Sequence, residues 1–276
     1  KHYGVITTKT GDYPTENMQI KKSNQTHVII VLFLVIAIET MGTGFAWLTF
    51  GELFTGKSTT LFSSNVSMQW RNILYGISMG ITSLFMFLAA PWLGHISDHI
   101  GRRKTLLFCL FGTSLGMGIS ILGINFNQVT LLMFSRAWLG SIAACQIIAQ
   151  AAMIDISTKQ NKTSLLGVAS AANNTGFIIG PVIGGLLIDN TLVGWFNYTT
   201  PFYFAAILAA LGAILLLMTY KETLKNKKTK PPELTKHHKL FARAFTHKDI
   251  RIVAFICICF HIGWAMYFHT VFLSLI

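Results

Sequence analysis

The sequence predicts an all-α membrane protein that crosses the bilayer seven times. Hydrophobic residues make up 52% of the 276 residues and charged residues only 12%, whereas a soluble domain averages about 25% charged residues. Seven apolar stretches also reach about 20 residues, the length that an α-helix needs to cross a bilayer. Helices are expected because a segment in lipid must satisfy its own backbone hydrogen bonds.

The predicted spans follow one another closely along the chain. An amino-terminal segment at 1–27 precedes the first six spans, which lie within 28–220, and a basic segment at 221–251 separates them from the seventh, at 252–276. The spans are Val28–Phe50, Ile73–Leu93, Thr105–Ile124, Val129–Ile154, Leu165–Leu187, Phe202–Tyr220 and Ile252–Ile276.

This arrangement is typical of a transporter half followed by a single extra helix. Many transporters consist of two six-helix halves related by symmetry. Because the second half stops here after one helix, we expect the chain to be a fragment or a truncated gene product. The lack of an initiator Met favours a fragment. Its missing partner is then the carboxy-terminal half of the transporter.

Lysine and arginine residues are distributed unevenly between the two sides of these spans. Nineteen lie before the first span, between the second and third, between the fourth and fifth, or after the sixth; two lie on the other side. Such residues accumulate on the cytoplasmic side, so we predict a cytoplasmic amino terminus. The net charge of +12 then reflects topology and attraction to anionic lipid, and we expect no nucleic-acid partner.

A polar loop is predicted between the second and third spans. Residues 94–104 read Gly-His-Ile-Ser-Asp-His-Ile-Gly-Arg-Arg-Lys. Gly94 and Gly101 allow the chain to turn, because glycine reaches positive φ without strain. Asp98 is expected to cap a helix N-terminus or to meet a helix dipole. Topology needs neither this acid nor the glycines, so we interpret the two glycines, Asp98 and Arg102 as a gate.

The basic residues of this loop have two interpretations. Arg102 and Arg103 are placed to pair with Asp155, at the end of the fourth span. The alternative is that basic residues only enforce topology, and this is the interpretation we favour for Arg103 and Lys104.

The fifth span contains a run of small residues. Glycines spaced four residues apart lie on one face of a helix and allow a second helix to approach closely, and a proline kinks a helix by removing a backbone donor. The alternative is ordinary small-residue packing. The residues of this motif are Gly176, Gly180, Pro181, Gly184 and Gly185.

Two charged residues lie well inside predicted spans. Glu39 lies mid-span in the first helix and Arg136 about seven residues into the fourth. Intramembrane charges are costly and are functional by default, and burial disfavours the charged form of a carboxyl group. We therefore interpret both as candidates for proton coupling, in a paired or aqueous environment that they share. The alternatives are a structural acid and an arginine that reaches the membrane surface.

Together these motifs resemble the major facilitator superfamily. G-x-x-x-D-x-x-G-R-R is its signature loop between helices two and three, and G-x-x-x-G-P-x-x-G-G at 176–185 is similar to the fifth-helix motif of its drug:proton antiporters. The residues around Arg136 resemble its l-x-x-x-R-x-x-q-G-x-x-a-a pattern, with Leu139 at the usual Gln position. The surroundings of Glu39 are similar to the Asp-x-x-Gly-x-Gly start of tetracycline-type efflux pumps, with Glu in place of Asp.

The resemblance implies the six-helix amino-terminal half of a major facilitator fold, followed by the first helix of the second half. It also implies a multi-pass location in a cell membrane, such as a bacterial inner membrane, and export of drugs or other small molecules in exchange for protons. Protonation of Glu39 would bias one state, and the fifth helix would pack against the second half. Alternatives are a metabolite or siderophore carrier, including an uptake symporter, and an inactive truncated half.

Polar residues of the fourth and fifth spans are candidates to line a substrate cavity, although interhelical hydrogen bonding also explains them. They are Gln146, Gln150 and Asn173. The sequence has no nucleotide loop, metal-ligand cluster or catalytic triad, so we expect no cofactor, no metal site and no enzymatic activity.

Overall fold

The structure is a computed structural model that describes residues 15–56, 60–62, 65–222 and 224, with scattered residues between 251 and 266. Most of the predicted basic segment at 221–251 and most of the seventh span therefore lie outside the described residues. The helices in chain order are α1 (Thr15–Thr55), α2 (Met68–Ile100), α3 (Arg102–Asn125), α4 (Val129–Ile142), α5 (Cys145–Asp155), α6 (Lys162–Ile188) and α7 (Thr200–Thr219).

Six segments of the described chain are long and apolar enough to cross a membrane. They coincide with the six spans predicted between residues 28 and 220, so this part of the prediction is confirmed. The fourth span consists of two helices, α4 and α5, because Ala143 and Ala144 form a tight turn with ψ near −6° at both residues. One continuous helix was predicted here, and the break itself falls on two alanines, which are ordinarily good helix formers.

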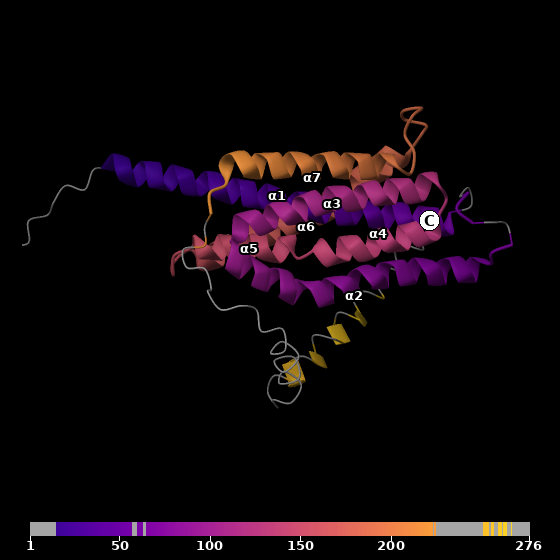
Figure 1. Cartoon of the computed structure of the whole chain (residues 1–276), viewed down its shortest axis with the longest axis horizontal. Coiled ribbons are helices and arrows are strands. Elements are labelled where there is room, and N and C mark those ends of the chain that lie inside the picture. Colours follow the sequence, from indigo (N-terminus) through magenta and orange to yellow (C-terminus); the bar gives the residue numbers. More distant parts are fainter. Residues whose placement is uncertain are drawn as a thin grey trace, which may run out of the picture.

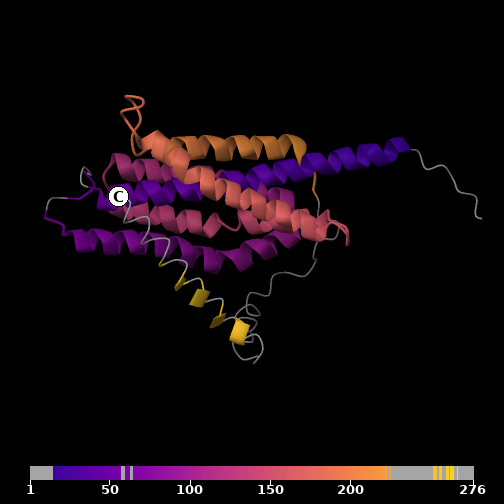
Figure 2. The same ribbon diagram turned by 180° about the vertical axis from the view of Figure 1, so that it is seen from behind.

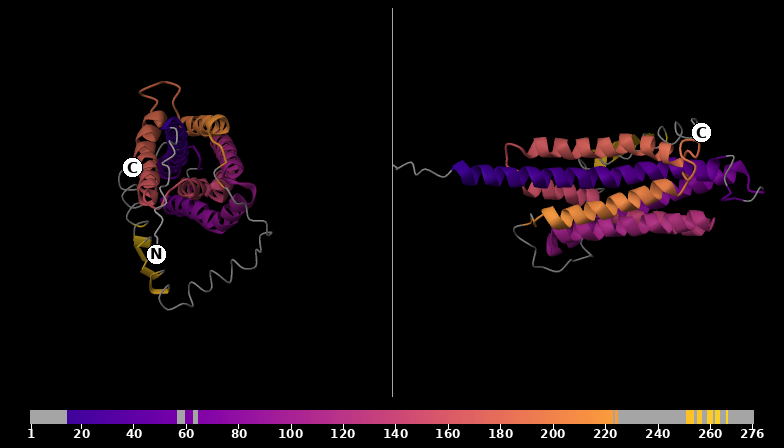
Figure 3. Two further views of the ribbon diagram at one scale, coloured as in Figure 1. Left: turned by 90° about the vertical axis from the view of Figure 1, so that its left-hand side faces the viewer. Right: turned by 90° about the horizontal axis from the view of Figure 1, so that it is seen from above.

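The helices lie roughly parallel in an elongated bundle, and α1 extends beyond the others at its amino-terminal end (Figure 1). α1 packs against both α6 and α7, α3 packs against α4 and α7, and α2 packs against α4. Seen from behind, α6 crosses α1 at an angle (Figure 2). The end-on view shows α1 between α6 and α7 (Figure 3).

Two apolar clusters fill the inside of the bundle, one towards each end. Along α1 the first cluster spans residues 31–36 and the second spans residues 45–54. Along α3 the first ends at Leu110 and the second begins at Met117. The two clusters therefore leave a layer between them at mid-span on both helices. We call the end of the bundle that carries Gly101, Asp155 and Tyr220 the basic end.

The predicted loop at 94–104 is mostly helical. α2 continues to Ile100 and α3 begins at Arg102, so only Gly101 separates them. α2 also begins at Met68, so Arg71, which was expected in the preceding loop, lies in its first turn. The reason is that hydropathy reports the apolar length of a span, whereas a helix continues into polar sequence until something breaks it. Here Gly101 breaks it, with φ of 107°.

Candidate functional site

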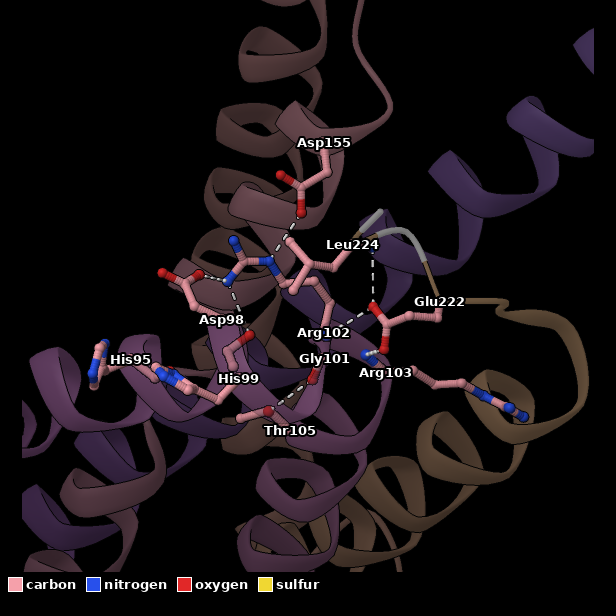
Figure 4. A network of polar contacts seen from close by, with 11 residues as sticks. His95, Asp98, His99, Gly101, Arg102, Arg103, Thr105, Asp155, Glu222 and Leu224 are labelled. Carbon is pink, nitrogen blue, oxygen red and sulfur yellow. Dashed lines mark hydrogen bonds and ion pairs between the residues drawn. The ribbon is translucent and has the colours of Figure 1, made fainter. Parts of the chain in front are cut away.

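Arg102 is the centre of a charged cluster at the basic end of the bundle. Its Nη1 atom lies 2.8 Å from Asp98 Oδ1, and its Nε atom lies 2.9 Å from Asp155 Oδ2. Nη1 also donates to Ser97 Oγ at 3.0 Å. Figure 4 shows the guanidinium between the two carboxylates. Because its side chain is only 10% exposed, these contacts are weakly screened and join α2, α3 and α5.

Part of the predicted pairing at this cluster is correct. Arg102 pairs with Asp155 as expected, but the guanidinium of Arg103 does not, and it donates instead to the carbonyl of Leu217 in α7 at 2.6 Å. Successive residues of a helix point in different directions, so the two arginines at the start of α3 reach different neighbours. Asp98 lies in the last turn of α2 and forms an ion pair with Arg102.

The two glycines of the motif have different structural roles. Gly101 adopts a positive φ of 107°, and Thr105 Oγ1 donates to its carbonyl at 2.9 Å. Gly94 lies inside α2, and a side chain at this position would meet no atom within 4 Å. The expected turn at Gly94 is therefore wrong, because the helix continues past it.

Glu39 lies in the layer between the two apolar clusters. Its side chain is half-buried, and Oε1 accepts a hydrogen bond from Thr113 Oγ1 of α3 at 2.9 Å. The thiol of Cys145, the first residue of α5, also contacts this carboxyl group and has Cys109 as its neighbour. The acid thus has two neighbouring donors inside the bundle, a hydroxyl on α3 and a thiol at the start of α5.

Arg136 is buried at a different level of the bundle, with an exposed fraction of 2%. Its Cζ atom lies 5.1 Å from the centre of the Phe50 ring, and Nη2 lies 3.7 Å from Met79 Sδ. Tyr75 is also close. Within the described residues its Nε atom has no hydrogen-bond partner. An aromatic face stabilises this cation through a cation–π interaction.

Glu39 and Arg136 do not form an ion pair with each other, which was one of the two shared environments expected for them. Arg136 stacks on Phe50, which follows Glu39 on α1 by eleven residues, or about 16 Å along a helix axis. The carboxylates that pair with Arg102, those of Asp98 and Asp155, lie at the basic end, away from both charges. Each intramembrane charge therefore has its own neighbours.

The glycines of α6 form a contact face for α1. A side chain at Gly176 would overlap Thr40 and Ala37, and one at Gly180 would come within 2.8 Å of the Met41 carbonyl. Pro181 lies against Gly44. This glycine face therefore packs within the same half, whereas the resemblance implied contact with the second half. Ile178, Val182 and Leu186 share a different face of α6, and their side chains are exposed.

The polar residues proposed for a cavity lie on two helices. Gln146 and Gln150 are half-buried on α5, and Asn173 is half-buried on α6. A groove of about 490 Å³ lies elsewhere, between α2 and α4, and is lined by Phe85, Leu88, Ala89, Trp92, Leu93, Ile96 and Ser141. That the three polar residues line one cavity stays a prediction.

Three contributors to these sites were missed by the sequence analysis. Thr113 lies at a mid-span depth similar to that of Glu39, on a helix that runs in the same direction. The sequence could therefore have predicted a contact between these two residues. Glu222 accepts hydrogen bonds from the start of α3, and its position directly after the last span of the bundle is a weaker signal. Phe50 is one of many apolar residues, and no sequence feature singles it out as the partner of Arg136.

Comparisons with known proteins agree with this architecture. A family model described as Major Facilitator Superfamily matches residues 29–276. The tetracycline resistance protein, class H, of Pasteurella multocida is 30% identical over 199 residues, which cover 72% of this chain and 46% of that protein. Multidrug resistance protein 1 of Bacillus subtilis is 33% identical over 153 residues, covering 55% of this chain and 37% of that protein. The chain spans about half the length of the curated relatives it matches, or less.

Solved structures with the same fold are more distant in sequence. The crystal structure of the human organic anion transporter MFSD10 (TETRAN) has a TM-score of 0.61 at 20% identity, covering 75% of this chain and 50% of that chain. A bacterial homologue of the human lysosomal transporter Spinster, inward-facing and unoccupied, has a TM-score of 0.61 at 16% identity, covering 81% and 48%. At these identities the likeness concerns the fold alone.

Proposed function

Since this chain belongs to the major facilitator superfamily, we propose that it forms part of a proton-coupled transporter that exports small molecules by alternating access. The observation that carries the proposal is the position of Glu39. Its carboxyl group lies inside the bundle, between two apolar clusters, with the Thr113 hydroxyl as a donor. An ionisable group at such a depth is costly and is expected to be functional.

The proposed coupling follows from the charge of this carboxyl group. When Glu39 is protonated it is neutral, so the layer between the apolar clusters can close without burying a charge. When it releases the proton, the carboxylate requires water or a cationic partner and favours an open state. A proton gradient thus biases the equilibrium between two conformations through a difference in free energy at one residue.

The Arg102 cluster is the proposed gate of this cycle. Its two ion pairs hold α2, α3 and α5 together at the basic end, and the gate opens when they separate. We assign the basic end to the cytoplasm on the basis of its Lys and Arg residues, which places the amino terminus inside. The exposed face of α6, with Ile178, Val182 and Leu186, is available to lipid or to a second bundle.

Drugs are the proposed substrate class. Relatives that are about one-third identical are named tetracycline resistance and multidrug resistance proteins. The candidates for substrate contact, or for a further part in proton coupling, are Arg136, which lies on the Phe50 ring, and the polar residues Gln146, Gln150 and Asn173 of α5 and α6. The identity of the drug depends on all the residues that line the substrate cavity of the transporter.

Transport into inside-out vesicles tests this proposal. Vesicles from bacteria that express the intact protein are given tetracycline or ethidium, with and without an imposed pH gradient. We expect gradient-driven accumulation with the parent and its loss in Glu39→Gln, which keeps size and hydrogen bonding but cannot release a proton. The matched control is Asp189→Asn, an exposed acid after α6 whose carboxylate bonds only locally to Thr191.

The outcomes separate the alternatives. Full gradient-driven transport by Glu39→Gln would mean that this acid is structural. Substrate movement in the same direction as protons would support the uptake symporter. A complete absence of transport, with normal insertion of the protein, would favour an inactive half.

A further inference from the structure

Glu222 links the segment after α7 to the start of α3. Its Oε1 atom accepts a hydrogen bond from the backbone N–H of Arg102 at 2.9 Å, and Oε2 accepts one from the N–H of Arg103 at 3.3 Å. Oε1 also accepts from the N–H of Leu224 at 3.1 Å. Figure 4 shows the carboxylate at the N-terminus of α3, on the side away from Asp98 and Asp155.

The start of α3 needs such a partner. The first backbone N–H groups of a helix have no acceptor within the helix. The residue in the capping position is Gly101, which has no side chain and makes no side-chain cap. A carboxylate at this position also interacts favourably with the positive end of the helix dipole. Glu222 therefore does what a capping side chain normally does, but from 120 residues away.

A second bond, also donated by α3, reinforces this link. The guanidinium of Arg103 donates to the carbonyl of Leu217, in the last turn of α7, at 2.6 Å. The beginning of α3 thus donates backbone groups to Glu222 and a side chain to α7. Together these bonds tie the orientation of the first turn of α3 to the end of α7.

The link acts on the residue at the centre of the gate. Arg102 is held at its backbone by Glu222 and at its side chain by Asp98 and Asp155. A Cβ atom at position 101 would overlap the carboxylate of Glu222. Glycine at position 101 therefore accommodates both the positive φ and the approach of the Glu222 carboxylate to the helix.

We propose that Glu222 is a positioning residue of the gate, which caps α3 from the segment after α7 and so sets the orientation of Arg102 between its two carboxylates. Any movement of that segment is then transmitted to the gate through the Glu222 carboxylate. The capping step stands on the contacts alone, whereas its effect on transport rests on the proposed gate function.

Amide hydrogen exchange measures the capping step directly. The intact protein in lipid nanodiscs is compared with Glu222→Ala, Glu222→Gln and Asp155→Asn, with Asp189→Asn as the matched control. We expect Glu222→Ala to speed exchange in peptides that cover residues 101–105 by about tenfold, the effect of losing a helix cap. Glu222→Gln keeps an acceptor oxygen and should show a smaller increase. Asp155→Asn removes a side-chain partner only and should leave these amides protected.

Transport by the same variants tests the positioning role. Glu222→Ala should lower the maximal transport rate severalfold without changing the substrate concentration at half-maximal rate, and Glu222→Gln should recover part of the loss. A Gly101→Ala substitution should cost less in the Glu222→Ala background than in the parent, because the overlap with the carboxylate is then absent.

Three results would overturn the proposal. Unchanged exchange at residues 101–105 in Glu222→Ala would show that the carboxylate does not cap α3. Faster exchange with parental transport would show a cap with no effect on the gate. If Asp98→Asn transports normally, the proposed gate function is wrong, and the positioning role of Glu222 in the gate is then wrong as well. The exchange result still decides separately whether Glu222 caps the helix.

Discussion

Arg102 and Asp155 form an ion pair between the first residue of α3 and the last residue of α5, with 2.9 Å between Nε and Oδ2. The pair joins two helix ends that are 53 residues apart in the sequence. The side chains of Arg102 and Asp155 are 10% and 24% exposed, so the pair is partly shielded from water. The pair therefore fixes the start of α3 against the end of α5 in this conformation.

Asp155→Asn should weaken this contact without adding bulk. Arg102 keeps Asp98 but loses one charged partner, and hydrogen bonds to charged groups contribute about 1.5–3 kcal/mol. We expect at least a tenfold fall in transport rate with normal membrane insertion, and the same for Asp98→Asn. The measurement is drug accumulation in inside-out vesicles, normalised to protein level, with Asp189→Asn as the control. A parental rate in either variant would contradict the gate role.

Thr113→Val should alter the response of transport to pH. The substitution removes the hydroxyl that donates to Glu39 Oε1 at 2.9 Å and keeps a similar shape. Since a donor to a carboxylate favours its charged form, its loss should move the pH midpoint of transport upwards, and Thr113→Ser should restore the parental midpoint. Transport rates across a pH series provide the test, and identical profiles for the three proteins would show that Thr113 does not act on Glu39.

Phe50→Leu should destabilise the protein through Arg136. Leucine preserves apolar contact but lacks the aromatic face that lies 5.1 Å from the guanidinium, and a desolvated cation–π contact is worth about 2 kcal/mol. We expect a lower thermal midpoint in detergent for Phe50→Leu. The loss should be much smaller when Arg136 has been replaced by Met. Equal losses in both backgrounds would mean that Phe50 contributes packing only.

Gly176→Ala should separate α1 from α6. The added methyl group would overlap Thr40 and the Ala37 carbonyl, whereas at Gly167, on the same helix, it would meet nothing within 4 Å. Forced overpacking costs about 1–3 kcal/mol, so Gly176→Ala should lower the thermal midpoint and Gly167→Ala should not. A neutral Gly176→Ala would place the contact between α1 and α6 in doubt.

Labelling with an impermeant thiol reagent should reveal the orientation of the bundle. Asn125 and Lys162 are both exposed, at opposite ends of the bundle. If the basic end is cytoplasmic, a cysteine at 125 reacts in intact cells, and one at 162 reacts only after permeabilisation. The reverse pattern would invert the proposed topology. The parent protein, with its native cysteines, serves as the background control.

The contacts around Arg102 could be predicted from the sequence only in part. A turn at Gly101 and an ion pair between Arg102 and Asp155 were predicted and are present. The turn predicted at Gly94 is absent, and Arg103 contacts Leu217 instead of Asp155. Glu222 was not predicted, because its partners are backbone N–H groups that any sequence provides. Likewise, Glu39 and Arg136 were expected to share one environment, but their depths along two helices place them at different levels of the bundle.

The sequence by itself determined that this chain is a helical membrane protein, where its six spans between residues 28 and 220 lie, and to which superfamily its motifs belong. These properties depend on local composition and on spacing along one chain, because lipid requires each span to be apolar and internally hydrogen-bonded. Only the tertiary structure decided which donor reaches Glu39, which ring holds Arg136 and which helix the α6 glycines face. Those contacts depend on the rotation and depth of each helix relative to its neighbours, which side-chain packing across the whole bundle sets together.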